Sequence, residues 1–138
     1  MFLVERGKGK LMSQGELFEK GLKVRKEVLG DDYVNKSNAG ADAFTRTMAE
    51  WSTAYCWGAL WTRPGMDRRT RSIVNLAMIS ALNRPHELKL HVKAALKNGL
   101  TKEEMKEIFL QVAVYAGVPA GIDSFRIARE AFKEVEGE

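Results

Sequence analysis

The chain has 138 residues, a length that suits one domain with a sizeable buried core. Hydrophobic residues make up 45% of it and charged residues 29%, a globular balance that argues against disorder. The formal net charge is only +4, and basic and acidic residues are mixed along most of the chain. This pattern argues against nucleic-acid binding and suits a small anionic substrate at least as well.

No apolar run approaches the roughly 20 residues that a membrane-spanning helix needs. The opening MFLVERGKGK also lacks the apolar stretch of a secretory signal. Cys56 is the only cysteine, which excludes a disulfide within the chain and agrees with a reducing compartment. We therefore expect a cytoplasmic protein with no membrane partner.

The pattern predicts an all-α fold preceded by a short arm. Residues 1–13 show no usable periodicity, which predicts a flexible arm. Residues 14–138 show helical spacing, no strand-like alternation and no linker, so we expect one compact domain of six or seven helices. The predicted helices are, in chain order, Gln14–Leu29, a short one from Asp31 or Asp32 to Asn38–Gly40, Ala43–Tyr55, one capped by Asp67 that ends near Leu82, Pro85–Asn98, Thr101 to Ala116, and one from Pro119 toward the C-terminus.

Start and stop signals mark several of these helices. Ser13 with Glu16, and Thr101 with Glu104, have the spacing of capping boxes, in which side chains satisfy the free amides of a helix start. Further signals are Asp42 and Asp67 as N-caps and Gly30, Gly99 and Gly117 as stops.

Two stretches in the middle of the chain carry more specific expectations. Cys56–Gly65 combines tryptophan, glycine and proline, which favours an aromatic-rich loop or a broken helix. Ile73–Leu82 is so apolar that its helix, with Ser80 counted on the apolar face, should be central to the core.

The segment RPHELKLH, Arg84 to His91, is the strongest candidate for chemistry. Its two histidines lie five residues apart, which separates them by roughly 140° around a helix. The four-residue spacing of a zinc-protease HExxH motif would place them on one face. The two histidines are therefore not expected to chelate one metal, and we predict no metal site.

Glu87 and His91, by contrast, lie four residues apart and share a helix face. A carboxylate beside an imidazole can fix its tautomer and favour its protonated form, as a general acid or base requires. The same spacing also fits a purely structural pair that braces the helix. Both interpretations remain open from the spacing alone.

Three stretches carry a family resemblance: DRRTRSIVNLAMISALNRPHELKLHVKAALKNGLTKEEMKEIFLQVAVYAGVPAGIDSFRIARE (Asp67–Glu130), GLKVRKEVLG (Gly21–Gly30) and YCWGALWTRPGMDRRTRS (Tyr55–Ser72). Together they resemble the carboxymuconolactone decarboxylase family, within the alkylhydroperoxidase D-like superfamily. The resemblance implies an all-helical fold and a homo-oligomer, trimeric or hexameric. Peroxidase members of the superfamily carry CxxCxxxH, and superposition on His91 places Arg84 and Glu87 where those cysteines stand. Peroxidase activity is therefore not expected.

The resemblance implies decarboxylation of 4-carboxymuconolactone, a small anionic lactone, to the enol-lactone of 3-oxoadipate. This reaction belongs to aromatic catabolism by way of protocatechuate, the β-ketoadipate pathway. Because the unsaturated lactone serves as its own electron sink, no cofactor is required. In this scheme His91 is the general acid and Glu87 its orienting partner.

The substrate-binding residues are predicted with less support from spacing. His86 is a candidate donor, although it points away from the other two unless the helix begins irregularly. Trp61 is a candidate wall of the pocket or a plain core residue. The candidate anion clamps are Arg63, Arg68, Arg69, Arg71 and Arg84, with simple solvation as the alternative.

Two other functions remain open. The first is an enzyme of the same fold that acts on another unsaturated lactone or on a keto acid. The second is a non-catalytic, oligomeric helical binding protein in which the Glu87–His91 pair only braces the helix.

Overall fold

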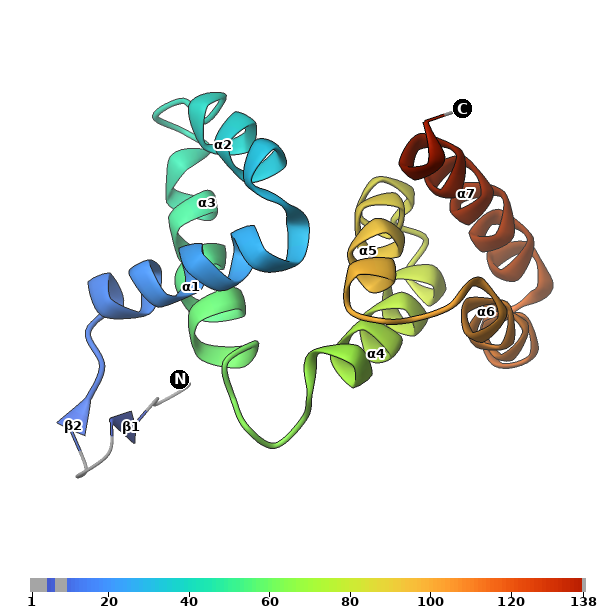
Figure 1. Cartoon of the computed structure of the whole chain (residues 1–138), viewed down its shortest axis with the longest axis horizontal. Helices are drawn as coiled ribbons and strands as arrows, with labels where there is room; N and C mark the ends of the chain where they lie inside the picture. The colour runs from blue at the N-terminus through green and yellow to red at the C-terminus, as the bar shows by residue number, and fades with distance from the viewer. Residues whose placement is uncertain (1–4, 7–9, 138) are drawn as a thin grey trace. The chain divides into compact units, whose positions relative to one another are not determined.

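A computed structural model describes residues 5–6 and 10–137 and divides the chain into two compact units, 1–65 and 66–138 (Figure 1). The all-α class is confirmed: within the described residues, seven α-helices and one π-helix hold most of the chain. The remaining regular structure is a two-residue antiparallel pair, β1 Glu5–Arg6 with β2 Lys10–Leu11. Most of the predicted arm, residues 1–4 and 7–9, lies outside the described residues, and the domain boundary at 13/14 stays a prediction.

The first unit contains α1 Gln14–Leu29, α2 Asp31–Ala39, α3 Arg46–Ser52 and the π-helix η1 Thr53–Leu60. The predicted capping box at the start of α1 is present. The amide of Ser13 donates to the Glu16 carboxylate at 2.9 Å, and the amide of Glu16 donates to the Ser13 hydroxyl at 3.3 Å. Leu17, Val24 and Val28 then face the interior of the unit, and α1 ends at Gly30 with φ of 94°.

The helix predicted over Ala43–Tyr55 was wrong in its bounds. For Cys56–Gly65 the loop alternative was wrong, whereas the broken-helix alternative agrees with a helix that stops at Leu60. Asp42 caps a turn rather than a helix, because its carboxylate accepts from the amides of Phe44 and Thr45 at 3.1 and 2.8 Å. The α-helix begins only at Arg46, and its continuation from Thr53 to Leu60 is a π-helix, not a loop.

Backbone contact between α1 and η1 explains the glycine at position 58. A Cβ atom on Gly58 would lie 2.0 Å from the carbonyl oxygen of Leu17, and one on Gly21 would lie 1.9 Å from that of Thr53. The two helices therefore pack with their backbones in contact, which only glycine permits at these positions. The glycine at 58 thus reflects a close helix crossing rather than a break.

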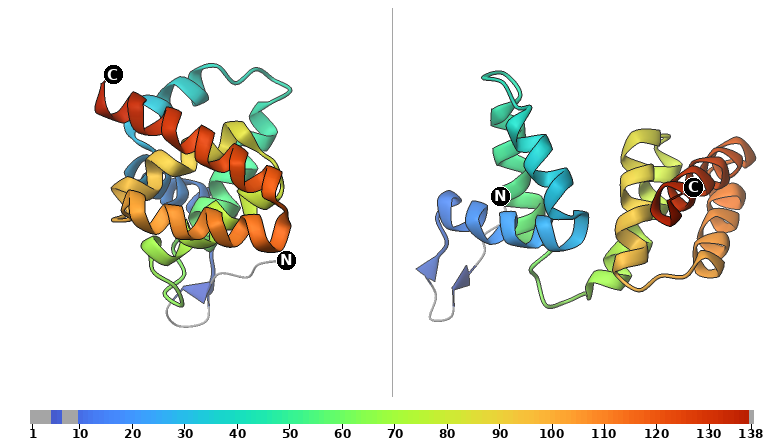
Figure 2. Two further views of the ribbon diagram at one scale, coloured as in Figure 1. Left: turned by 90° about the vertical axis from the view of Figure 1, so that its right-hand side faces the viewer. Right: turned by 45° about the horizontal axis from the view of Figure 1, so that its top comes forward.

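The second unit contains α4 Arg68–Ala81, α5 Pro85–Lys97, α6 Lys102–Ala116 and α7 Val118–Glu136, which form a compact group (Figure 2). The predicted signals hold: Asp67 accepts from the amide of Thr70 at 2.7 Å, and the Thr101–Glu104 capping box opens α6. All four helices contribute to one buried cluster. Its members include Leu76, Leu88, Val92, Leu100, Met105, Phe109 and Ile127.

The expectation that α4 is central to the core was wrong for one of its faces. Leu76 is fully buried, but Val74, Met78 and the following Leu82 are 39%, 49% and 65% exposed. These three side chains lie on the face opposite the buried cluster. The apolar run Ile73–Leu82 therefore contributes to the buried core on one face of the helix and to an exposed apolar surface on the other. None of the helices in the described ranges is long and apolar enough to cross a membrane.

Candidate active site

Helix α5 positions the pair that the sequence singled out. Pro85 is its first residue, where the missing amide proton costs no hydrogen bond. Leu88, Val92 and Ala95 are buried against the rest of the unit and hold the helix in place. Each of the two larger side chains contributes about 1.5–3 kcal/mol by burial. Glu87 and His91, four residues apart, stand one turn from each other on the flank of this anchored face.

The two members of the pair differ in exposure. Glu87 is exposed in the first turn of α5, where the helix dipole favours a carboxylate. His91 is half-buried, and burial lowers the pKa of its imidazole below the ordinary value of 6.5. The charge of Glu87 raises that pKa, but by less than burial lowers it. The resulting ring is neutral at pH 7 and gains a proton only under more acidic conditions or beside another anion.

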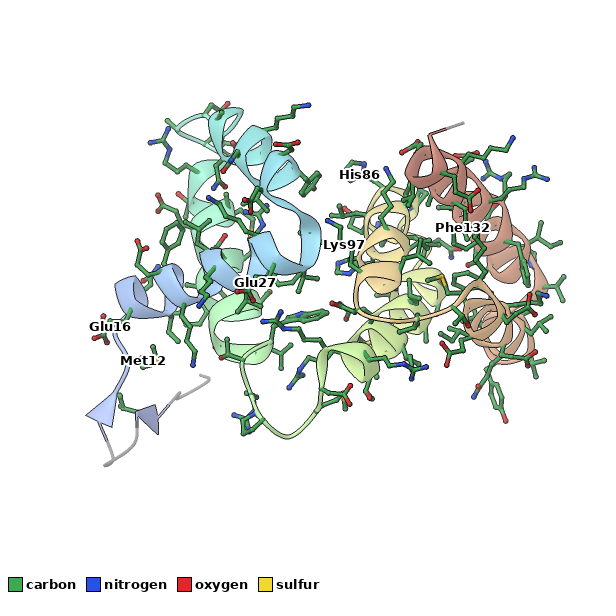
Figure 3. All side chains as sticks on the ribbon, viewed as in Figure 1. Met12, Glu16, Glu27, His86, Lys97 and Phe132 are labelled. Carbon is green, nitrogen blue, oxygen red and sulfur yellow. The ribbon has the colours of Figure 1, made fainter. Side chains whose placement is uncertain are left out.

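His86 is exposed, and its side chain stands out from the first turn of α5 (Figure 3). It lies on a different side of the helix from His91, as the five-residue spacing predicts. The structure gives no sign that the helix begins irregularly enough to bring the two rings together. A role for His86 in binding stays a prediction.

Arg84 lies at the junction of α4 and α5, outside the helical geometry that would align it with Glu87. As N-cap it has φ and ψ of −109° and 81°, and it lines a pocket of about 180 Å³ with residues of α4 and α7. Neither Glu87 nor His91 lines that pocket. Seven residues along a helix also correspond to about 10 Å, so Arg84 reaches His91 only through an extended side chain or a substrate between them.

The other candidate arginines of the second unit lie in the first turn of α4. Arg69 forms an ion pair with Glu104 of α6, so its charge already has a partner. Arg71 is half-buried, one residue before Ser72, whose hydroxyl accepts from the side-chain amide of Asn98 at 2.9 Å. This bond fixes the start of α4 against the end of α5. Arg68 and Arg71 both take part in interactions of their own.

Trp61 and Arg63 belong to the first unit. Trp61 is only 6% exposed and stacks on Trp57, with the ring centroids 4.9 Å apart, so it forms part of that unit's interior. Arg63 is exposed in the turn after η1, where its amide donates to the carbonyl of Leu60 at 3.1 Å. Their participation in substrate binding stays a prediction.

Cys56 lies exposed on η1, and partial burial raises the pKa of its thiol. A thiol of raised pKa is a poor nucleophile, whereas a redox-active cysteine has a lowered pKa.

Within residues 5–6 and 10–137, no group of three or more His, Cys, Asp or Glu side chains is placed to hold a metal ion.

The structure singles out two polar residues that the sequence reasoning missed. Arg25 is 8% exposed and donates to the side chains of Ser37, Asn38 and Thr53 at 3.1, 3.2 and 3.3 Å. In the sequence it is followed by Lys26 and Glu27, so charge alone does not set it apart. The available signal was its place on the apolar stripe of the helix, four residues after Gly21 and three before Val28. Ser80, counted above as part of an apolar face, is 2% exposed and lines the pocket beside Arg84.

Comparison with known proteins decides the family. Residues 46–130 match the carboxymuconolactone decarboxylase family, and this range includes both members of the Glu87–His91 pair. The chain belongs to the carboxymuconolactone decarboxylase family.

Two relatives are each 40% identical to this member of the family. One is the 4-carboxymuconolactone decarboxylase of Acinetobacter baylyi, matched over 124 residues that cover 90% of this chain and 92% of the relative. The other is the nitrosuccinic acid decarboxylase npaB of Metarhizium robertsii, matched over 119 residues, or 86% and 83%. A third relative, an uncharacterized 15.0 kDa protein of Paracoccus denitrificans encoded between nqo9 and nqo10, is 32% identical over 85 residues, 59% of this chain and 63% of its own length. Both relatives with a named activity are decarboxylases.

Proposed function

We propose that this protein is a cofactor-free decarboxylase that converts 4-carboxymuconolactone to the enol-lactone of 3-oxoadipate in aromatic catabolism. The observation that carries the proposal is the near end-to-end similarity, at 40% identity, to a 4-carboxymuconolactone decarboxylase. The Glu87–His91 pair on a helix anchored in the core supports it, because a proton donor must be held in a fixed place.

The electrons of the breaking bond have an acceptor within this substrate. The departing carboxylate is attached to the ring carbon γ to the lactone carbonyl, across a carbon–carbon double bond. As the bond between that carbon and the carboxylate breaks, its electron pair moves through the double bond onto the carbonyl oxygen. The products of this step are CO2 and a furan-like dienolate, so the protein must mainly stabilise negative charge and deliver a proton.

His91 is the proposed source of the proton. Its imidazolium gives a proton to the ring carbon α to the carbonyl, which restores the carbonyl and leaves a neutral imidazole. Solvent returns the proton, so each turnover consumes one proton and releases one CO2. Burial disfavours the imidazolium, whereas Glu87 and a bound carboxylate both favour it. The negative charge of the bound substrate thus favours the protonated form of His91, which the reaction requires.

Glu87 is proposed as a positioning residue and arginines as the carboxylate clamp. Among the arginines, Arg71 is favoured because it is half-buried at the start of α4. Arg63, Arg84, His86 and Trp61 remain further candidates for substrate contact.

A second substrate class has a specific observation in its favour. The relative from Metarhizium robertsii, equally similar to this chain, is a nitrosuccinic acid decarboxylase. Nitrosuccinic acid is also a dicarboxylic acid, and its nitro group can accept the electron pair that CO2 leaves behind. The two substrates therefore share a built-in electron sink and a second carboxylate, and the same proton donor suits both.

One experiment tests the function and chooses between the substrates. The purified protein is supplied with 4-carboxymuconolactone or nitrosuccinate in D2O, and CO2 release and deuterium incorporation are measured. The first proposal expects a much higher kcat/KM for the lactone and one deuterium at the α carbon on a single face. Preference for nitrosuccinate would assign the second substrate. Turnover of neither would contradict both substrates and leave an enzyme for another unsaturated lactone or keto acid, or the non-catalytic alternative.

Variants then test the assigned roles. His91→Gln should lose turnover while helicity by circular dichroism is retained, and Glu87→Gln should lose part of it. Glu107→Gln, an exposed carboxylate on α6, is the matched control for the loss of one negative charge. Equal activity of His91→Gln and the parent protein would contradict the role of His91.

We further propose that the protein assembles into a homo-oligomer, a trimer or a hexamer. A groove of about 580 Å³ between α4 and α6 supports this, because no charged residue lines it. Val74, Met78 and Tyr115, which line it, are 39%, 49% and 85% exposed, an apolar surface of the kind that subunit interfaces cover.

A further inference from the structure

A small pocket in the second unit lies apart from the Glu87–His91 pair. It is formed where α4 ends, α5 begins and α7 passes both, three elements that pack together in this unit (Figure 1). Its volume is about 180 Å³, and residues 79–88 and 120–127 supply its whole lining. The polar members of the lining are Ser80, Asn83, Arg84, Asp123, Ser124 and Arg126.

The hydroxyl of Ser80 is the first sign of a ligand. Ser80 is 2% exposed, and its oxygen has no hydrogen-bond partner among the residues that the structure describes. Buried hydroxyls are nearly always hydrogen-bonded, because an unmade bond forfeits the interaction with water without replacement. A bound group that accepts from Ser80 would restore that bond.

Arg84 supplies charge at the same pocket. Its guanidinium makes no ion pair or side-chain hydrogen bond within residues 5–6 and 10–137. The other guanidinium of the lining, that of Arg126, donates to Asp123 at 3.0 Å. One positive and one negative charge of the lining thus offset each other, and the charge of Arg84 remains in excess.

The backbone between α4 and α5 holds these groups together. Asn83 has φ of 54°, the only non-glycine residue in the left-handed region within the described ranges. Asparagine tolerates this conformation better than most side chains, but the conformation is still unfavourable for an L-residue. It reverses the chain so that Ser80 at the end of α4 and Arg84 at the start of α5 line one cavity. The positive end of the α5 dipole lies at the same place.

We propose that this pocket binds a small oxyanion, a hydrogen phosphate or a compact carboxylate. Ser80 and Arg84 donate to its oxygens, and the excess positive charge favours an anion over water. The cavity has the volume of about six water molecules at ~30 Å³ each, which fits one such ion with its remaining hydration but not a nucleotide. Glu87 and His91 are absent from the lining, so the site is separate from the proposed proton donor.

Ser124 distinguishes the two kinds of oxyanion. It is 1% exposed, and its hydroxyl donates to the carbonyl of Ala120 at 2.7 Å, which leaves only its lone pairs for a ligand. Hydrogen phosphate retains a P–OH group that can donate to this oxygen, whereas a carboxylate has no proton to give. We therefore expect phosphate to bind more tightly than acetate.

The test is a titration of the full-length protein with inorganic phosphate and, separately, with acetate, followed by amide chemical shifts. Saturable shifts are expected at Ser80, Asn83 and Ser124, with phosphate half-saturating in the millimolar range. Ser80→Ala should weaken phosphate binding about tenfold, since a hydrogen bond to a charged group is lost. Arg84→Gln should weaken it further, and Lys97→Gln, which removes one positive charge at the far end of α5, should change it by less than about twofold.

Asp123→Asn should change the affinity for phosphate in the opposite direction to Ser80→Ala and Arg84→Gln. Removing the one carboxylate of the lining should tighten phosphate binding, whereas a pocket that holds only water or a cation would show no gain or a loss. If acetate binds as tightly as phosphate, the ligand is a carboxylate held by the same donors, Ser80 and Arg84. The proposal is overturned if neither anion gives saturable shifts at these amides, or if Ser80→Ala and Arg84→Gln bind as well as Lys97→Gln. Because the readout is binding, these results do not depend on whether the protein decarboxylates the lactone.

Discussion

The carboxylate of Glu87 stands one helical turn before the imidazole of His91 on α5, and its charge raises the pKa of a ring whose burial lowers it. The balance between these two effects sets the pH at which His91 can donate a proton. It therefore links the local geometry of one helix to a measurable pH profile.

The pH profile of kcat/KM is the first prediction. Because the folded pKa of His91 lies below 6.5, activity should reach a plateau at acidic pH and fall about tenfold per pH unit above that pKa. Glu87→Gln removes the charge that raises the pKa, so its descending limb should lie at lower pH. Steady-state kinetics across the pH range measure both limbs. An unchanged limb in Glu87→Gln would separate Glu87 from the proton donor, and Glu107→Gln should superpose on the parent curve.

Stability should also depend on pH through the same ring. With the folded pKa lowered, the unfolded chain binds the proton first as the pH falls, so stability is lost from about pH 6.5 downward. In His91→Gln this part of the loss should be absent. Urea midpoints measured at several pH values between about 5 and 8 detect the difference. Parallel curves for the two proteins would show that His91 is equally protonated in the folded and unfolded states.

The backbone contact between α1 and η1 gives a prediction about folding of the first unit. Gly58→Ala should destabilise by more than about 4 kcal/mol, because the new Cβ would lie 2.0 Å from a backbone oxygen that cannot move independently. Gly15→Ala is the matched control: nothing lies within 4 Å of its Cβ position in α1, so it should stabilise by about 0.5–1 kcal/mol. Chemical denaturation checks both. Equal stability of the two variants would contradict the close crossing.

Arg25 should contribute to the same unit through its hydrogen bonds. Its burial lowers its pKa, and its partners are the neutral side chains of Ser37, Asn38 and Thr53. Arg25→Lys keeps the charge but cannot reach all three acceptors, so we expect a loss of about 2–3 kcal/mol. Arg46→Lys, on the exposed start of α3, should change stability by less than about 0.5 kcal/mol. A similar loss in both variants would point to a general preference for arginine.

Assembly can be tested on the apolar surface of the second unit. Met78→Glu places a charge in the groove between α4 and α6 and should reduce the mass measured by light scattering, with helicity unchanged. Gln14→Glu adds the same charge at an exposed helix start in the first unit and should leave the mass unchanged. A parent protein that is already monomeric would refute the proposed oligomer.

Much of the fold was predictable because its signals are local. The capping boxes at Ser13 and Thr101 and the stops at Gly30 and Gly117 satisfy backbone groups within a few residues, so the bounds of α1 and α6 follow from the sequence. The π-helix was missed because it depends on contact with α1, far away along the chain. The exposed side of α4 was missed because an apolar run does not reveal which side is covered.

In the candidate site, too, the features set by local sequence were predictable and those set by packing were not. The alignment of Glu87 and His91 follows from helical geometry alone and was predicted. The direction of the His91 pKa was not, because it depends on burial by surrounding residues. Arg84 was predicted only as one of several candidate clamps. Its N-cap dihedral angles depart from the helical geometry of α5, and it lines a pocket that neither Glu87 nor His91 lines.

The capping boxes have a consequence for variation among homologues and for protein engineering. Each box fixes the first turn of its helix through bonds within four residues, Ser13 to Glu16 in α1 and Thr101 to Glu104 in α6. The rotational phase of each helix is therefore set from inside the helix and not by the segment before it. Insertions, deletions or affinity tags ahead of either box should leave the buried face of the helix where it is, which makes these two junctions suitable places to change the length of the chain.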